Sequence, residues 1–176
     1  DTLITEVTKT ITDFNTSELI KFDVVLRHSK LLGAIDATDP SITSSSVIPR
    51  IAKYFTPTTG TSNSYNIYFN NSIQNPHDGH NSGGGGVMSS TGFYVSGEFN
   101  TNEQFFDDDG RGNIRYYYFT GVTRNYTDIT AGTVNYKTGK VSINALNILS
   151  ISNIDGAAST RIRIVALPNS NDIVAV

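Results

Sequence analysis

Two short runs of alternating residues around a glycine-containing turn constrain this chain more than any other stretch. Residues 131–146 read AGTVNYKTGKVSINAL. The apolar members of the two alternating runs are Val134, Tyr136, Val141, Ile143 and Ala145. Period-two alternation on both sides of a turn predicts a β-hairpin with one buried face. Gly139 lacks a Cβ and can adopt the positive φ that such a turn requires.

The same alternation predicts a register for the hairpin. A four-residue loop over Lys137–Lys140 places Tyr136 opposite Val141 and Val134 opposite Ile143, so that the apolar side chains share one face. A three-residue loop would mix the two faces. Because a one-residue slip moves every side chain of a strand to the opposite face, we prefer the four-residue loop.

The hairpin also resembles a known family. Residues 132–141 (GTVNYKTGKV) fit the pattern G-x-V-D/N-Y-x-T-G-x-I/V of the ring-forming baseplate wedge protein of contractile-tailed, T-even (T-four-like) bacteriophages, the sixth-gene-product class. Residues 161–173 (RIRIVALPNSNDI) resemble the segment that follows the hairpin in that family. The resemblance extends over residues 132–176, the C-terminal part, and implies a structural role for Gly132, Tyr136 and Gly139.

The resemblance carries functional expectations. It implies a non-enzymatic structural virion protein of the tail baseplate, assembled in the bacterial host cytoplasm, with no cofactor. It implies that the protein forms homodimers, contacts other baseplate proteins and builds a ring that joins tail tube, sheath and fibres. No individual interface residue is carried over from the family.

Composition narrows the remaining classes. Charged residues are 16% of the chain and the formal net charge is −3, without a basic stripe, so nucleic-acid binding is not expected. The absence of cysteine excludes disulfides and thiolate metal sites. The chain contains no run of about 18 apolar residues, so no membrane span is predicted. The first residue is Asp1 and the last residues, Ala175 and Val176, resemble part of a strand, so we expect a fragment of a longer protein.

Several further segments are expected to be extended. The Thr-rich residues 3–14 are predicted to form a strand or arm, and residues 20–27 a strand, although Ser17–Leu19 leaves a helical start open. Residues 28–50 and 75–91 are predicted to be irregular. Further strands are predicted in the ranges 65–69, 93–99, 114–119, 148–154 and 161–167. In three of them one face is predicted from alternation, and its members are Tyr65, Ile67 and Phe69; Phe93, Val95, Gly97 and Phe99; and Ile162, Ile164 and Ala166.

Together these segments predict an all-β, sandwich-like fold with long loops and little helix. One β-rich domain over residues 1–176 is expected, with a possible sub-boundary in the Gly-rich stretch near 75–92.

The candidates for metal or catalytic chemistry are weak. Asp107 and Asp109 resemble part of a calcium loop, but Arg111 and Tyr118 occupy ligand positions, which favours an exposed hairpin turn. His77 and His80 offer two imidazoles without further ligands nearby. No nucleophile elbow is present, and no phosphate loop follows the four glycines at 83–86.

An aromatic strand supplies the candidate interface. Tyr116 and Tyr118 are predicted on one face and Tyr117 and Phe119 on the other, so one face is expected either to anchor a partner or to be buried in a second layer. Arg161 and Arg163 are further candidate partner contacts, expected either on the same outer surface as the exposed aromatic face or simply solvated. A non-catalytic carbohydrate- or receptor-binding β-module is the alternative function, weakened by the absence of Trp, and a hydrolase is a distant third.

Overall fold

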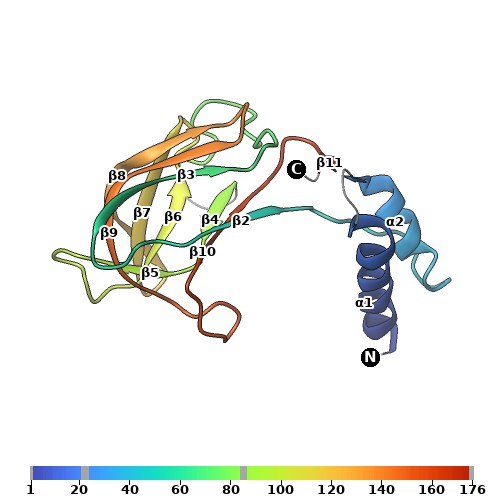
Figure 1. Ribbon diagram of the computed structural model, residues 1–176. Helices are drawn as coiled ribbons and strands as arrows, with labels where there is room; N and C mark the ends of the chain where they lie inside the picture. The colour runs from blue at the N-terminus through green and yellow to red at the C-terminus, as the bar shows by residue number, and fades with distance from the viewer. Residues whose placement is uncertain (1, 21–23, 84–86, 175–176) are drawn as a thin grey trace. The chain divides into compact units, whose positions relative to one another are not determined.

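The computed structural model describes residues 2–20, 24–83 and 87–174 (Figure 1). It divides into two compact units, which we call unit 1 (Asp1–Pro49 and Ser170–Val176) and unit 2 (Arg50–Asn169). The division does not fall in the Gly-rich stretch near 75–92, which lies within unit 2. A single domain over the whole chain stays a prediction.

Unit 1 contains both α-helices of the described residues. Its elements are α1 (Thr2–Phe14), the π-helical turn η1 (Asn15–Leu19), β1 (Val25–Leu26), α2 (His28–Asp36) and β11 (Ile173–Val174). The helices α1 and α2 lie side by side (Figure 1). The two-residue strands β1 and β11 pair antiparallel, so the C-terminal segment packs with the N-terminal segment in unit 1.

The prediction of an extended arm over residues 3–14 was wrong, because these residues form α1. The more buried side chains of α1, Val7, Thr10 and Phe14, follow helical spacing. Threonine hydroxyls, which lower helix propensity, here bond to the helix itself: Thr8 donates to the Ile4 carbonyl over 2.7 Å, and Thr12 and Thr16 repeat this contact one turn further on. Packing of one helical face therefore overrides the low propensity.

Residues 28–50 are also less irregular than predicted, because α2 begins at His28. The first backbone N–H of α2 has no partner within the helix and donates to Asp172 Oδ1 over 3.1 Å. The predicted strand 20–27 is reduced to β1, with Val24 and Leu26 on the more buried side. Its residues 21–23 lie outside the described residues.

Unit 2 consists of two antiparallel sheets. The smaller sheet has the order β2 (Ile51–Phe55), β10 (Ile162–Ala166), β4 (Met88–Ser90). The larger has the order β3 (Ser62–Tyr68), β9 (Lys140–Ile151), β5 (Phe93–Val95), β6 (Gln104–Asp108), β7 (Asn113–Thr120), β8 (Thr123–Asn135). Because β8 also pairs with β9, the larger sheet closes on itself like a barrel.

This arrangement confirms the β-rich fold class and refines its architecture. Strands make up 41% and helices 16% of the described residues. The sandwich expected from the sequence is instead a barrel-like sheet with the three-stranded sheet packed against it. The reason is β9, whose 12 residues are long enough to pair with β3, β5 and β8.

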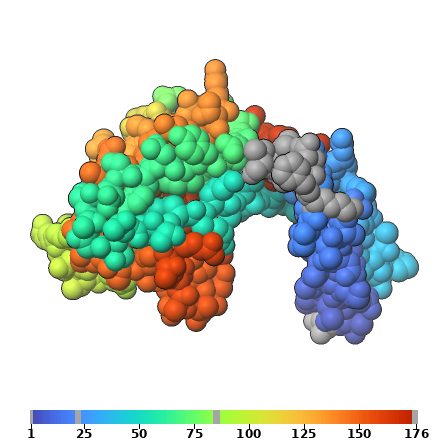
Figure 2. Space-filling model, in the orientation of Figure 1, coloured from blue at the N-terminus to red at the C-terminus, as the bar shows by residue number. Residues whose placement is uncertain are grey.

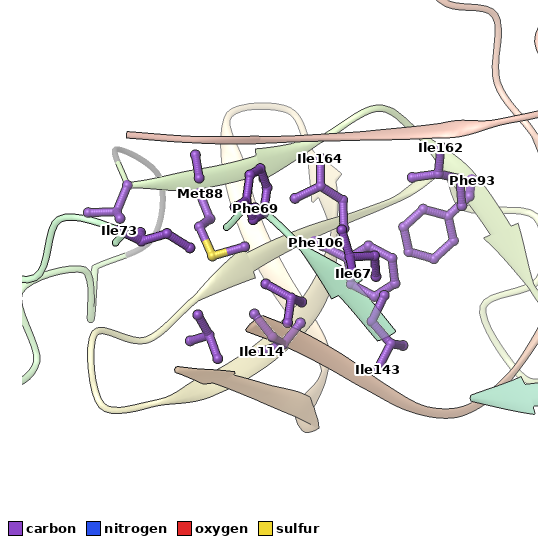
Figure 3. Packing of buried hydrophobic residues seen from close by; sticks show 14 of the residues in the cluster. Ile67, Phe69, Ile73, Met88, Phe93, Phe106, Ile114, Ile143, Ile162 and Ile164 are labelled. Atoms are coloured by element: carbon purple, nitrogen blue, oxygen red, sulfur yellow. The ribbon is translucent and has the colours of Figure 1, made fainter. Parts of the chain in front are cut away.

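The hydrophobic core of unit 2 lies between these sheets. Figure 3 shows Ile162 and Ile164 of β10 directed toward the same interior as Phe106, Ile114 and Ile143 of the larger sheet. The predicted alternation is confirmed where it was clearest, since Ile162, Ile164 and Ala166 are all buried. The faces assigned to residues 65–69 and to Phe93 and Val95 are also confirmed.

The segment predicted as a loop over 75–91 contributes to this core. Val87 and Met88 are buried, and Met88–Ser90 forms β4 opposite β10. The Gly84–Gly86 part of the glycine run lies outside the described residues. The strand predicted over 93–99 ends at Val95. Strand β4 was missed because its three residues show too little alternation to indicate a strand.

Candidate functional site: a carboxylate network and the cleft at the β8–β9 turn

The β8–β9 hairpin has a register two residues from the predicted one. Val134 lies opposite Val141, and Gly132 opposite Ile143, so the four-residue loop is Tyr136–Gly139 rather than Lys137–Lys140. The apolar side chains still share one face, because a shift of two residues conserves the faces. Alternation determines the face of each residue, but it leaves registers that differ by two equally acceptable.

Local hydrogen bonds decide the register. Asn135 Oδ1 accepts from the backbone N–H groups of Lys137 and Thr138, both over 3.1 Å, and the Asn135 carbonyl accepts from Gly139 over 2.8 Å. Gly139 adopts the expected positive φ, +68°. A Cβ at Gly139 would lie 2.2 Å from the carbonyl oxygen of Asn71, so the turn also depends on close backbone approach.

Tyr136 leaves the strand ladder and reaches a buried carboxylate. Its hydroxyl donates to Asp108 Oδ2 over 2.6 Å. Asp108 is fully buried and also accepts from the side-chain amide of Asn81 over 2.5 Å and from the Gly110 N–H over 3.2 Å. Burial and the neighbouring Asp108 carboxylate raise the pKa of Tyr136 far above its ordinary value. The network thus ties the hairpin turn to β6.

A second buried carboxylate, Asp107, lies on the outer face of the larger sheet. It accepts from Arg115 Nε over 2.9 Å, from Arg124 Nη1 over 3.2 Å and from the Tyr126 hydroxyl over 2.9 Å. Burial raises the pKa of the Asp107 carboxyl, and the two guanidinium groups and the tyrosine oppose this rise. Arg115 Nη1 also donates to the Ser82 carbonyl, and Arg115 Nη2 donates to the Asp108 carbonyl.

The prediction that Asp107 lies in an exposed charged turn is therefore wrong. Asp107 and Asp108 belong to β6 and are 1% and 0% exposed. The turn proper begins at Asp109, whose oxygens accept from the backbone N–H groups of Arg111 and Asn113 and from the Asn113 amide. Cross-strand arginine and tyrosine partners, which lie 8 to 19 residues away, make the burial of Asp107 possible.

The weak metal candidates do not converge on one site. Asp107 and Asp109 each use both carboxylate oxygens for protein donors. His80 Nδ1 and His77 Nε2 are 3.2 Å apart and bond to each other. Within residues 2–20, 24–83 and 87–174, no group of three or more potential metal ligands was found.

The β8–β9 turn forms one wall of a cleft of about 800 Å³. The other walls come from residues 72–78 and from the β6–β7 turn at Gly110–Gly112. In Figure 2 the orange hairpin and the green segment beside it both reach the surface of unit 2. Backbone bonds join these walls: Ile73 N–H donates to the Tyr136 carbonyl over 2.7 Å, and Gly79 N–H to the Gly110 carbonyl over 3.1 Å.

The structure separates the candidate interface aromatics into two environments. Tyr116 packs on Phe93 and Phe106 at the core, and Tyr118 stacks on Phe99. Tyr117 and Phe119 lie on the outer face, where Arg124 stacks over both rings. Tyr117 is nevertheless buried by these neighbours, whereas Phe119 stays 44% exposed. Burial raises the pKa of both Tyr116 and Tyr117.

Arg161 and Arg163 lie on the three-stranded sheet, away from the aromatic strand. Arg161 stacks over the Tyr54 ring, and Arg163 forms an ion pair with Asp155 at 2.9 Å. Because their neighbours Ile162 and Ile164 face the core, both arginines point to the outer side of the smaller sheet. They do not join the Tyr117–Phe119 face, contrary to the shared surface considered from sequence.

Comparison with known families gives a match over the N-terminal part of the chain. Residues 1–54 match the family model described as baseplate structural protein gp6, C-terminal domain III. Over these residues the chain is similar to the gp6 class of baseplate structural proteins. The resemblance to this family that was expected from the sequence is thus confirmed over residues 1–54, and the match supports a structural role in the phage baseplate.

The matched residues are not those that carried the resemblance. The match covers the N-terminal segment of unit 1 and the first strand of unit 2, whereas the hairpin pattern lies at 132–141. A search of curated proteins found no match. In the described residues, no helix is long and apolar enough to cross a membrane.

Proposed function

We propose that this chain is a non-enzymatic wedge component that assembles the baseplate ring through protein–protein contacts, one of them with a second copy of itself. The observation that carries the proposal is the family match over residues 1–54. The matched segment contains α1, so we assign the self-contact to this helix.

The surface of α1 supports this assignment. Ile4 and Ile11 lie two turns apart on one side of the helix and are 65% and 44% exposed, and Leu3 is exposed beside them. Exposed apolar residues at helical spacing are typical of helix–helix contacts between chains. The opposite side carries the charged pair Lys9 and Asp13, which remains hydrated. A two-fold contact through Ile4 and Ile11 buries this stripe in an isologous interface.

The outer face of the larger sheet offers a second contact surface for other baseplate proteins. Phe119 and Val122 of the β7–β8 hairpin are exposed, next to Arg124. Exposed aromatic and arginine side chains are enriched at protein interfaces. The carbohydrate-binding alternative has less support, because its stacking residue Tyr117 is buried under Arg124.

Light scattering over a concentration series tests the self-contact. The chain is expected to show a concentration-dependent dimer, and the double variant Ile4→Glu, Ile11→Glu is expected to stay monomeric. Lys9→Glu places the same side chain on the charged side of α1 and should leave the dimer unchanged. A monomer at every concentration, or an equally stable dimer of the double variant, would overturn the assignment of the contact to α1.

A further inference from the structure

The cleft at the β8–β9 turn has a charge opposite to that of the chain. Arg111, Lys137 and Lys140 line it, and Asp78 is the one acidic residue among its lining residues. The chain as a whole carries a formal charge of −3. Potentials at protein contacts are complementary, so a cationic cleft on an acidic protein selects an anionic partner. We propose that this cleft binds an acidic, extended peptide segment of another protein.

The walls of the cleft are fixed before any ligand binds. The Phe69 N–H donates to the Gly139 carbonyl over 2.9 Å, and the Asn75 amide donates to the Gly110 carbonyl over 3.1 Å. A Cβ at Gly110 would lie 2.5 Å from the backbone nitrogen of His80, so the β6–β7 turn and the turn at residues 77–80 touch through their backbones. A preformed site avoids part of the ordering cost of binding.

The cationic side chains remain available at the surface. Lys137 and Arg111 are exposed. The distance from Arg111 Nε to Asp78 Oδ2 is 3.9 Å, which is the outer limit for an ion pair, and both groups are hydrated. Lys140 lies with its ammonium group 5.7 Å from the Tyr68 ring centroid. An incoming carboxylate can therefore pair with these groups without breaking a buried ion pair.

Two aspartates near the floor oppose an anionic ligand, and the hydrogen bonds limit their effect. Asp108 is buried beneath the turn and accepts from Tyr136, Asn81 and Gly110. Asp109 accepts three bonds from Arg111 and Asn113. Neither is a lining residue, so neither carboxylate faces a ligand in the cleft.

The lining favours a peptide over a sugar. Sugar sites commonly rely on a free aromatic face, and the aromatic lining residue is Tyr136, whose hydroxyl is fixed on Asp108. The amide side chains of Asn135 and Asn169 also line the cleft, and amide groups can form hydrogen bonds with a peptide backbone. The proposal concerns unit 2 alone and does not depend on the self-contact proposed for α1.

Fluorescence anisotropy with a labelled, end-capped hexaglutamate peptide tests the proposal on the 176-residue chain. We expect saturable binding that weakens strongly when salt rises from about 0.05 M to about 0.5 M, as for exposed ion pairs. The double variant Lys137→Glu, Lys140→Glu should weaken binding by about tenfold or more, which corresponds to about 1.4 kcal/mol. Hexalysine should not bind.

Controls separate the cleft from net charge and from misfolding. Lys9→Glu lowers the charge at one site outside the cleft, and a paired variant Lys9→Glu, Lys30→Glu matches the full charge change. Both should bind hexaglutamate like the unaltered chain. Lys137→Gln, Lys140→Gln, with an unchanged unfolding transition, should give an intermediate loss. Undiminished binding by the cleft variants, or equal loss in the paired control, would overturn the proposal, as would binding of a heparin hexasaccharide in preference to the peptide.

Discussion

The Tyr136 hydroxyl donates a 2.6 Å hydrogen bond to Oδ2 of Asp108 and so joins the turn of the β8–β9 hairpin to the end of β6. Asp108 has no exposed surface, and its side-chain partners, Tyr136 and Asn81, are neutral donors. A buried carboxylate depends on each of its donors, because water cannot replace a lost one.

Removing this hydroxyl should therefore destabilise unit 2. Tyr136→Phe is expected to lower the free energy of unfolding by about 1.5–3 kcal/mol, the range for a hydrogen bond to a charged group. Urea unfolding followed by circular dichroism measures the change. Tyr68→Phe, at an exposed tyrosine of β3, is the matched control and should change stability little. Equal effects of the two substitutions would show that the Tyr136–Asp108 bond is not important.

The same tyrosine predicts a loss of stability at alkaline pH. Burial and Asp108 raise the pKa of Tyr136 in the folded state above the value of 10.0 that it has when unperturbed. A group with a raised folded pKa contributes its full stability below the unfolded pKa and loses it as the pH rises above that value. The free energy of unfolding should thus begin to fall near about pH 10 and continue to fall as the pH rises further.

The alkaline prediction can be assigned to Tyr136 by substitution. The fall in unfolding free energy should be smaller in Tyr136→Phe than in the unaltered chain. Burial also raises the pKa values of Tyr116, Tyr117 and Tyr126, and these tyrosines will contribute to the remaining slope. Identical slopes for the variant and the unaltered chain would contradict the assignment to Tyr136.

Two of the ion pairs of unit 2 should differ sharply in importance. Asp107→Asn leaves the buried Arg115 guanidinium without its carboxylate and is expected to cost about 3–5 kcal/mol, as for the loss of one partner of a buried pair. Asp155→Asn removes the same charge from Arg163 at a site where Asp155 is 75% exposed, and should cost less than about 1 kcal/mol. Chemical denaturation of both variants provides the comparison, and similar losses would refute it.

Two glycines with positive φ allow the cost of a close backbone contact to be measured apart from the cost of a left-handed conformation. Gly139 and Gly60 both have positive φ, but a Cβ at Gly60 meets nothing within 4 Å, whereas one at Gly139 would lie 2.2 Å from the Asn71 oxygen. Gly60→Ala should cost about 1–2 kcal/mol, the cost of a left-handed residue. Gly139→Ala should cost about 1–3 kcal/mol more, from overpacking. The difference between the thermal unfolding midpoints of the two variants measures the added cost at Gly139. Equal midpoints would show that there is no added cost.

Short-range patterns predicted the parts of the fold in which each strand has one buried face. Ile162, Ile164 and Ala166 alternate with arginine and valine, and burial follows this alternation because side chains of a strand point to opposite faces. The same reasoning located the β8–β9 hairpin and the positive φ of Gly139. It could not choose between registers that differ by two, since these present identical faces.

Helix α1 shows where propensity misled the sequence reading. Threonine disfavours helices on average, yet Val7, Thr10 and Phe14 have helical spacing, and this signal was available in the sequence. Helix α2 had less local signal, because its first N–H bonds to Asp172, which lies 144 residues away.

The sequence by itself determined the β-rich class, the inward face of the clearest strands and the resemblance to a baseplate family, because these depend on residue type and on spacing over a few positions. Only the tertiary structure decided that Asp107 and Asp108 are buried, that Tyr136 leaves the hairpin ladder, and that Arg111, Lys137 and Lys140 meet at one cleft. The reason is that a carboxylate can leave water only where distant donors surround it, and the position of those donors is fixed by strand pairing.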